Sequence, residues 1–88
     1  MIFKPLANSD NCNTTPSSYG NNVLVRVSKF NNPNTATVVI CKANTGTQKW
    51  SILVLGGESV VLEKTATDTL ETATSATDMR AVAVSYKY

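Results

Sequence analysis

Few residues of this 88-residue chain could carry acid–base or nucleophilic chemistry. The chain contains no histidine, so it lacks the base that activates the nucleophile in Ser–His and Cys–His enzymes. Its acidic residues offer two closely spaced pairs, Asp68 with Glu71 and Glu58 with Glu63. Acidic residues in turns and on strand rims are ordinarily solvated, and nothing around these pairs indicates a cleft. We therefore expect a protein that is not an enzyme.

The same residues give little support for a metal or cofactor site. Asp68, Glu71 and Asp78 could offer oxygen ligands to calcium, but their spacing does not match an EF-hand loop. Structural zinc sites use paired cysteines or histidines, which this chain does not have. Gly56-Gly57 is not a phosphate-binding loop, because no Gly-Lys-Ser or Gly-Lys-Thr follows it. We expect neither a metal nor a cofactor.

The two cysteines, Cys12 and Cys41, have two interpretations. A disulfide would tie the N-terminal segment to the rest of the fold, whereas two free thiols would leave Cys41 as a small core residue. The first residues, Met1–Pro5, have no apolar segment typical of a secretory signal. Synthesis in a reducing cytoplasm favours the free thiols.

Charge and hydropathy argue against nucleic acid and membrane partners. The net charge is +2, and the eight basic residues form no run along the chain. A nucleic-acid-binding domain of this size usually gathers such residues into a patch, although alternation along strands could still bring some of them to one face. No apolar run approaches the roughly 20 residues that span a bilayer.

The most ordered pattern lies between Trp50 and Lys64, where apolar residues alternate with polar ones on both sides of Gly56-Gly57. Alternation with a period of two indicates strands with one buried face, and two glycines suit a tight turn. The pattern predicts a β-hairpin. Trp50, the only tryptophan, has the largest side chain and is expected at the centre of the core.

Alternation also predicts the remaining strands. Roughly a third of the residues are Asn, Ser or Thr, which favour turns and strands over helices. Thr35–Ala43 is apolar on both faces, so it should lie centrally and be covered on two sides. Thr65–Asp78 breaks the pattern and suggests one helical turn, with Leu70 closing an end of the core. The expected strands are Val23–Lys29, Thr35–Ala43, Thr47–Leu55, Ser59–Lys64, Met79–Tyr88 and, at an edge, Met1–Leu6.

The polar stretch Ala7–Asn22 has no apolar period. It is either a surface loop or an arm that orders against a neighbouring subunit, with Phe3, Leu6 and Tyr19 as partner contacts. The chain accordingly divides into an N-terminal arm, 1–22, and a β-sandwich domain, 23–88. Two small antiparallel sheets packed face to face would bury the alternate Val and Ile residues, and a partly open barrel is the alternative.

Three motifs in the second half resemble a known family. They are a Gly-Glu turn leading into a strand that ends in Glu-Lys (57–64), an Asp-Thr-Leu corner (67–70), and a closing strand of alternating Ala and Val (81–86). In these motifs the chain is similar to small virion structural proteins of tailed bacteriophages, especially those of marine cyanobacterial hosts. The resemblance implies an immunoglobulin-like or jelly-roll-like sandwich.

The resemblance also implies a role. Such a protein would be made in the host cytoplasm and would be a decoration, or cement, protein on the capsid surface of the virion. Its partners would be the major capsid protein and neighbouring copies of itself. Two other roles stay open: a tail, neck or fibre component of the virion, and a small module that binds carbohydrate or another ligand on a host surface.

Overall fold

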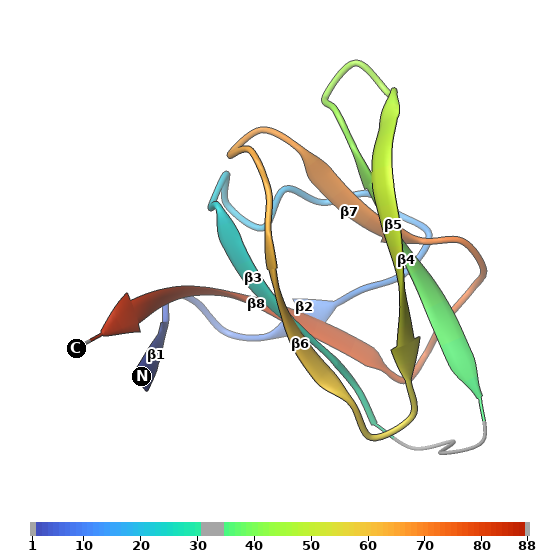
Figure 1. Ribbon diagram of the computed structural model, residues 1–88, viewed down its shortest axis with the longest axis horizontal. Coiled ribbons are helices and arrows are strands. Elements are labelled where there is room, and N and C mark those ends of the chain that lie inside the picture. Colours follow the sequence, from blue (N-terminus) through green and yellow to red (C-terminus); the bar gives the residue numbers. More distant parts are fainter. Residues whose placement is uncertain (1, 31–34, 88) are drawn as a thin grey trace.

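The computed structural model describes residues 2–30 and 35–87. Within them the chain forms strands and no helix (Figure 1). The strands are β1 (Ile2–Pro5), β2 (Asp10–Asn11), β3 (Leu24–Lys29), β4 (Ala36–Lys42), β5 (Gln48–Leu55), β6 (Ser59–Glu63), β7 (Thr69–Thr72) and β8 (Met79–Lys87). The six expected strands are therefore present, each within one residue of its expected bounds. Expected ends at Met1 and Tyr88 lie outside the described residues.

The strands form two antiparallel sheets that pack as a small β-sandwich, which confirms the expected fold class. The larger sheet has the order β1-β8-β3-β6, with β2 also paired to β8, and the smaller has the order β5-β4-β7. In Figure 1 the strands β3, β6 and β8 of the larger sheet overlap one another, and the strands β4, β5 and β7 of the smaller sheet lie to their right. Each sheet has one apolar face, and packing these two faces together removes both from water.

The core follows directly from the alternation in the sequence. Inward residues of β3, β4 and β8 alternate with outward ones, so short side chains from both sheets fill the interior. Leu70 and Met79 are the largest of the fully buried side chains. The core cluster comprises Cys12, Val25, Val27, Val39, Cys41, Val54, Leu62, Leu70, Met79 and Ala81.

The predicted hairpin from Trp50 to Lys64 is wrong. Strand β5 pairs with β4, and β6 pairs with β3, so the turn at Gly56-Gly57 carries the chain from the smaller sheet to the larger one. Gly57 adopts a φ of 81°, which favours glycine, and its amide donates to the Lys29 carbonyl 2.8 Å away. Alternation reports which face of a strand is buried, but it does not identify the neighbouring strand.

Trp50 does not lie at the centre of the core, contrary to expectation. It is partly buried and packs against the core cluster from the edge strand β5. The tryptophan side chain is too large for the space between two sheets whose facing side chains are mainly valine, alanine and cysteine. The smaller residues fill the middle, and the indole covers the margin.

Two expectations for the smaller sheet also need correction. Thr69–Thr72 is a strand, β7, and not a helical turn, although Leu70 is fully buried as expected. Strand β4 is central in its sheet, but only one of its faces is covered, because the side chain of Val38 on the other face is 36% exposed. Threonine suits a strand well because its branched side chain packs on a pleated surface.

Candidate functional site

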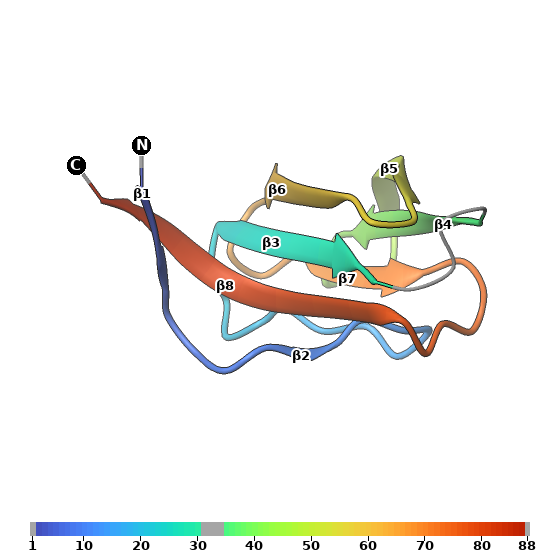
Figure 2. The same cartoon turned by 90° about the horizontal axis from the view of Figure 1, so that it is seen from below.

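The ends of the larger sheet form a two-stranded ribbon. Strand β8 pairs with β3 only as far as Ala83, so residues Val84–Lys87 pair with β1 alone. We call β1 with Val84–Lys87 the terminal ribbon. It projects beyond the body of the sandwich (Figures 1 and 2). Among residues 2–30 and 35–87 no third strand pairs with this ribbon, and a strand edge of this kind is a template for further strand pairing.

The terminal ribbon and its continuation expose two of the predicted contact residues. Phe3 is 38% exposed, and Leu6 is 46% exposed. Leu6 is held in place because its amide donates to the Ala83 carbonyl at 2.8 Å. Apolar side chains fixed at an accessible edge are suited to contact another protein.

The polar stretch Ala7–Asn22 lies against the body of the same chain. Strand β2 runs beside β8, and Ser17 exchanges two backbone hydrogen bonds with Leu70 of β7. The Asn13 carbonyl accepts from the Thr72 amide at 2.8 Å. This stretch therefore covers an edge of each sheet and contributes the buried Cys12 to the core.

Tyr19 faces its own chain and not the surroundings. Tyr19, Gly20 and Asn21 have φ values of 52°, 75° and 57°, a left-handed run that is costly for a bulky aromatic residue. The turn is stabilised by the Ser17 hydroxyl, which accepts from the Tyr19 amide at 3.1 Å. The Tyr19 hydroxyl donates to the Asn11 carbonyl at 3.0 Å, and the ring packs against the core cluster.

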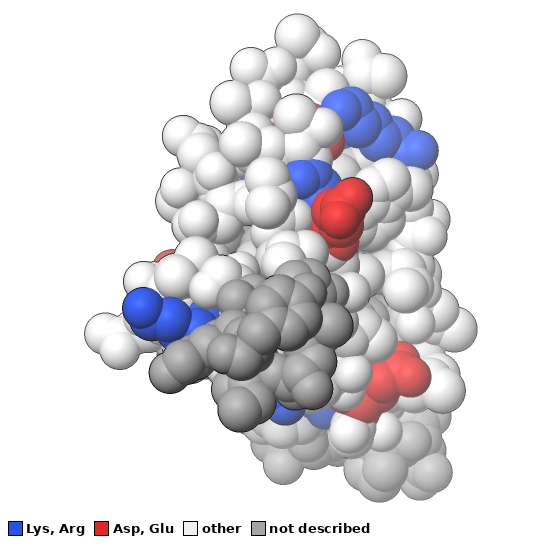
Figure 3. Space-filling view, turned by 60° about the vertical axis from the view of Figure 1, so that its left-hand side comes forward, with Lys and Arg blue, Asp and Glu red and all other residues white. Residues whose placement is uncertain are grey.

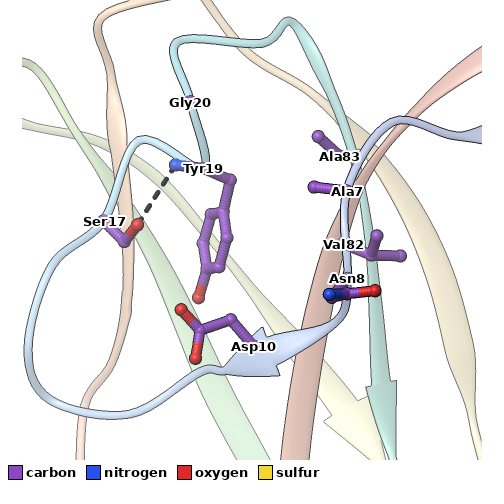
Figure 4. Close-up of a pocket in the computed structure, with 8 residues that line it drawn as sticks. All are labelled: Ala7, Asn8, Asp10, Ser17, Tyr19, Gly20, Val82 and Ala83. Carbon is purple, nitrogen blue, oxygen red and sulfur yellow. Dashed lines mark hydrogen bonds between the residues drawn. The ribbon is translucent and has the colours of Figure 1, made fainter.

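A cavity of about 220 Å³ lies beside Tyr19, between the 7–10 stretch, the 17–20 turn and β8 (Figure 4). Asp10 and Ser17 contribute polar atoms to it, and Val82 and Ala83 contribute apolar ones. Burial is the main cause that raises the pKa of Tyr19, so the phenol stays protonated and acts as a donor. The cavity is smaller than the roughly 300–1,000 Å³ usual for ligand sites, and it suits one side chain better than a free metabolite.

Neither Asp10 nor Ser17 was expected at this cavity. Both stand in a polar stretch with no periodic pattern, so the sequence gives no signal for the face that each presents. The face that Asp10 presents is set by the register of β2 against β8, in which Asp10 stands opposite Ala81. Such a register is visible only in three dimensions.

Two ion pairs with a buried carboxylate lie at opposite ends of the sandwich. At one end, Lys29 Nζ is 2.7 Å from Asp78 Oδ2 and 3.0 Å from Thr37 Oγ1, an arrangement that links the two sheets. At the other end, Lys49 Nζ is 3.0 Å from Asp68 Oδ2. Because both pairs are enclosed or hydrogen-bonded, we assign them to the fold and not to a reaction.

The acidic pairs singled out in the sequence are divided among separate contacts. The Glu58 carboxylate accepts from the Leu55 amide at 3.1 Å, and Glu71 pairs with Lys42 at 2.9 Å. Across the described residues no cluster of three or more His, Cys, Asp or Glu is arranged to hold a metal ion, and no helix is long and apolar enough to cross a membrane. On the face in Figure 3, basic and acidic side chains are interspersed among uncharged ones.

Both cysteines are free and fully buried, which confirms the expectation of free thiols and of Cys41 as a core residue. Burial is the main cause that raises the pKa of the Cys12 thiol, and the same is true of Cys41. A thiol reacts as its thiolate, so a raised pKa and the lack of access both make these cysteines unreactive.

The Asp68 cluster makes stability depend on pH. The Lys49 hydrogen bond is the main cause that holds the pKa of Asp68 below its ordinary value, with help from the Thr65 amide. Since the pKa of Asp68 is lower in the folded chain than in the unfolded one, ionised Asp68 stabilises the fold at pH values above the ordinary pKa of aspartate. That contribution is lost as the pH falls through the folded value.

We therefore expect Asp68→Asn to flatten the acid side of the stability profile below roughly pH 5. Urea unfolding at stepped pH values measures the effect. Glu63→Gln, at an exposed position on β6, is the matched control and should unfold as the wild type does at each pH. An Asp68→Asn profile as steep as that of the wild type would contradict the assignment.

The three predicted contact residues thus lie in different settings. Phe3 and Leu6 are exposed on or beside the terminal ribbon, whereas Tyr19 packs against the core cluster. Comparison of the chain with family models, with curated proteins and with solved structures gave no match.

Proposed function

We propose that this protein is a structural protein of a phage virion, a decoration subunit that binds the major capsid protein on the capsid surface. The observation that supports the proposal is the terminal ribbon, which projects from a compact body and exposes Phe3. A partner strand can add to either open edge through main-chain hydrogen bonds, while Phe3 and Leu6 enter apolar depressions on the partner.

The size of the domain fits such a role. One short ribbon offers only a small contact area, so a single copy would bind weakly. On a symmetric shell each copy can also contact its neighbours, and linked weak contacts add to a strong total. The free energy of binding then depends on the lattice as a whole and not on one extensive interface.

The number of copies of the protein per particle distinguishes two other functions from this one. A tail, neck or fibre component would be present in a few tens of copies at most, whereas decoration requires hundreds. A carbohydrate-binding module of a host surface would not need to be present on purified particles. Quantitative mass spectrometry of particles produced by the source of this sequence measures the number directly.

The ribbon is best tested by substitution and not by deletion. Removing residues 1–19 would take Cys12 from the core and uncover an edge of each sheet, so loss of binding could reflect unfolding. The double variant Phe3→Ser/Leu6→Ser keeps the backbone pairing. We expect its occupancy on particles that lack the protein to fall at least about tenfold, as for residues at the centre of an interface.

Leu53→Ser is the matched control, because Leu53 is 53% exposed on the outer face of the smaller sheet, away from the ribbon. It should bind as the wild type does. Unchanged occupancy of the ribbon variant would contradict the role of the ribbon. Particles that never contain the chain would contradict the capsid role itself.

A further inference from the structure

A second cavity, of about 240 Å³, lies on the outer face of the larger sheet between β3 and β8. Arg26 of β3 and Arg80 of β8 both line it. In the register of these strands, Ser28 stands opposite Arg80 and Val82 stands opposite Arg26. The two arginines are therefore diagonal neighbours on one face, close enough for their long side chains to act on the same guest.

Arg80 is held in a fixed position by neutral groups. Its guanidinium donates to the Asn11 side-chain oxygen at 2.9 Å, to the Ser9 carbonyl at 2.9 Å and to the Ser9 hydroxyl at 3.2 Å. These contacts use only part of the five N–H groups that a guanidinium carries. A cation that is already oriented loses less entropy when it binds an anion.

Arg26 also has no anionic partner in the part of the chain that the structure describes. It donates to the Ser59 hydroxyl at 3.4 Å, a long contact, and that hydroxyl is shared with Ser28 at 2.7 Å. Glu63 follows on the same face, diagonal to Arg26, but the two make no ion pair. Over residues 2–30 and 35–87, neither arginine has a carboxylate within ion-pair distance.

One wall of the cavity is apolar. Phe30 and Val82 form it beside the arginines, Ser9 and Ser28 add polar lining, and no acidic residue lines the cavity. The Phe30 side chain is 43% exposed, so its ring is open to contact. Asp10, the neighbour of Ser9 in the chain, lines the other cavity, and Asp78, two residues before Arg80, pairs with Lys29.

We propose that this cavity binds an oxyanion, and that its ligand is a carboxylate on an apolar stem, the acidic side chain of a partner protein. A guanidinium matches a carboxylate with two parallel hydrogen bonds, and an anion between two arginines offsets their mutual repulsion. The apolar wall packs against the methylene groups that join such a carboxylate to its backbone. Inorganic phosphate is also an anion, but it has no apolar stem to pack against this wall.

The test uses the isolated protein, so it does not depend on the proposed capsid role. Sodium butyrate, sodium acetate and sodium phosphate are titrated separately at constant ionic strength, with chloride as the balancing anion. Shifts of the Arg26 and Arg80 Nε–H signals in proton–nitrogen NMR spectra report binding. We expect saturable shifts, with butyrate binding more tightly than acetate or phosphate.

Arg26→Gln is the main variant, because within the described residues the Arg26 guanidinium hydrogen-bonds to Ser59 alone, whereas Arg80 anchors the 9–11 stretch. We therefore expect the Arg26 variant to keep the fold. We expect the affinity for butyrate to fall about tenfold or more, as for loss of a hydrogen bond to a charged group. Lys4→Gln, exposed on β1, removes the same unit of charge and should leave the affinity unchanged.

Three results would overturn the site: no saturable shift with any anion, unchanged affinity in Arg26→Gln, or an equal loss in Lys4→Gln. Tighter binding of phosphate than of butyrate would overturn the acidic side chain as the ligand. Loss of butyrate binding in Arg26→Gln alone would support both the site and its ligand.

Discussion

Replacing Leu70 with alanine is expected to lower the free energy of unfolding by about 3–4 kcal/mol. Leu70 is fully buried in β7, and it touches the core where the smaller sheet faces the 12–19 stretch. The truncation removes apolar contacts and leaves a cavity that a packed sandwich cannot close. A domain of this length has a total stability of only about 4–13 kcal/mol, so the variant should be near or below its folding threshold.

Urea unfolding followed by tryptophan fluorescence measures this loss, since Trp50 lies at the margin of the core. Leu53→Ala is the control, because this substitution removes the same atoms from a side chain that points outward. It should change the free energy of unfolding by about 0.5 kcal/mol or less. Equal effects of the two substitutions would mean that Leu70 is not a core residue.

Replacing Lys29 with methionine is expected to cost about 3–5 kcal/mol, the effect of removing one partner from a buried ion pair. The Lys29 side chain is 3% exposed, and its ammonium lies between Asp78 and the Thr37 hydroxyl. Without the ammonium, the Asp78 carboxylate keeps a charge in a site of low polarity. The penalty comes from that charge and not from lost volume, because methionine fills nearly the same space.

A second substitution distinguishes these causes. Adding Asp78→Asn to Lys29→Met removes the charge and should recover at least about half of the lost stability. Lys42→Met tests an ordinary pair: Lys42 is 34% exposed beside Glu71, so we expect a change of about 1 kcal/mol or less. A double variant as unstable as Lys29→Met would show that the buried charge is not the cause.

The sequence predicted the buried face of most strands, because a period of two depends only on local alternation. Val25 and Val27 share one face and point inward, as do Val39 and Cys41, whereas Val23, at the end of the same alternating run, is exposed. It did not predict which strands pair. The alternation around Gly56-Gly57 is the same whether the turn joins neighbours in one sheet or passes between two sheets, as it does here.

The elements that were missed are those with the weakest local signal. Strand β7 has one large apolar residue, Leu70, among threonines, and β2 is only two residues long. Both depend on long-range pairing with strands far away in the sequence. The exposed Phe3 and Leu6 could be anticipated from an edge strand beside Pro5, whereas the nearness of Arg26 and Arg80 required the register of β3 against β8.

The position of β8 has a consequence for how the molecule is made. Strand β8 lies between β1, β2 and β3, yet more than seventy residues precede it in the chain. During translation, β1 and β2 have no strand to pair with until β8 leaves the ribosome. The part of the larger sheet built on β8 therefore assembles after the β3–β6 pair and from distant segments, a topology expected to slow folding and to leave the nascent chain open to chaperones and proteases.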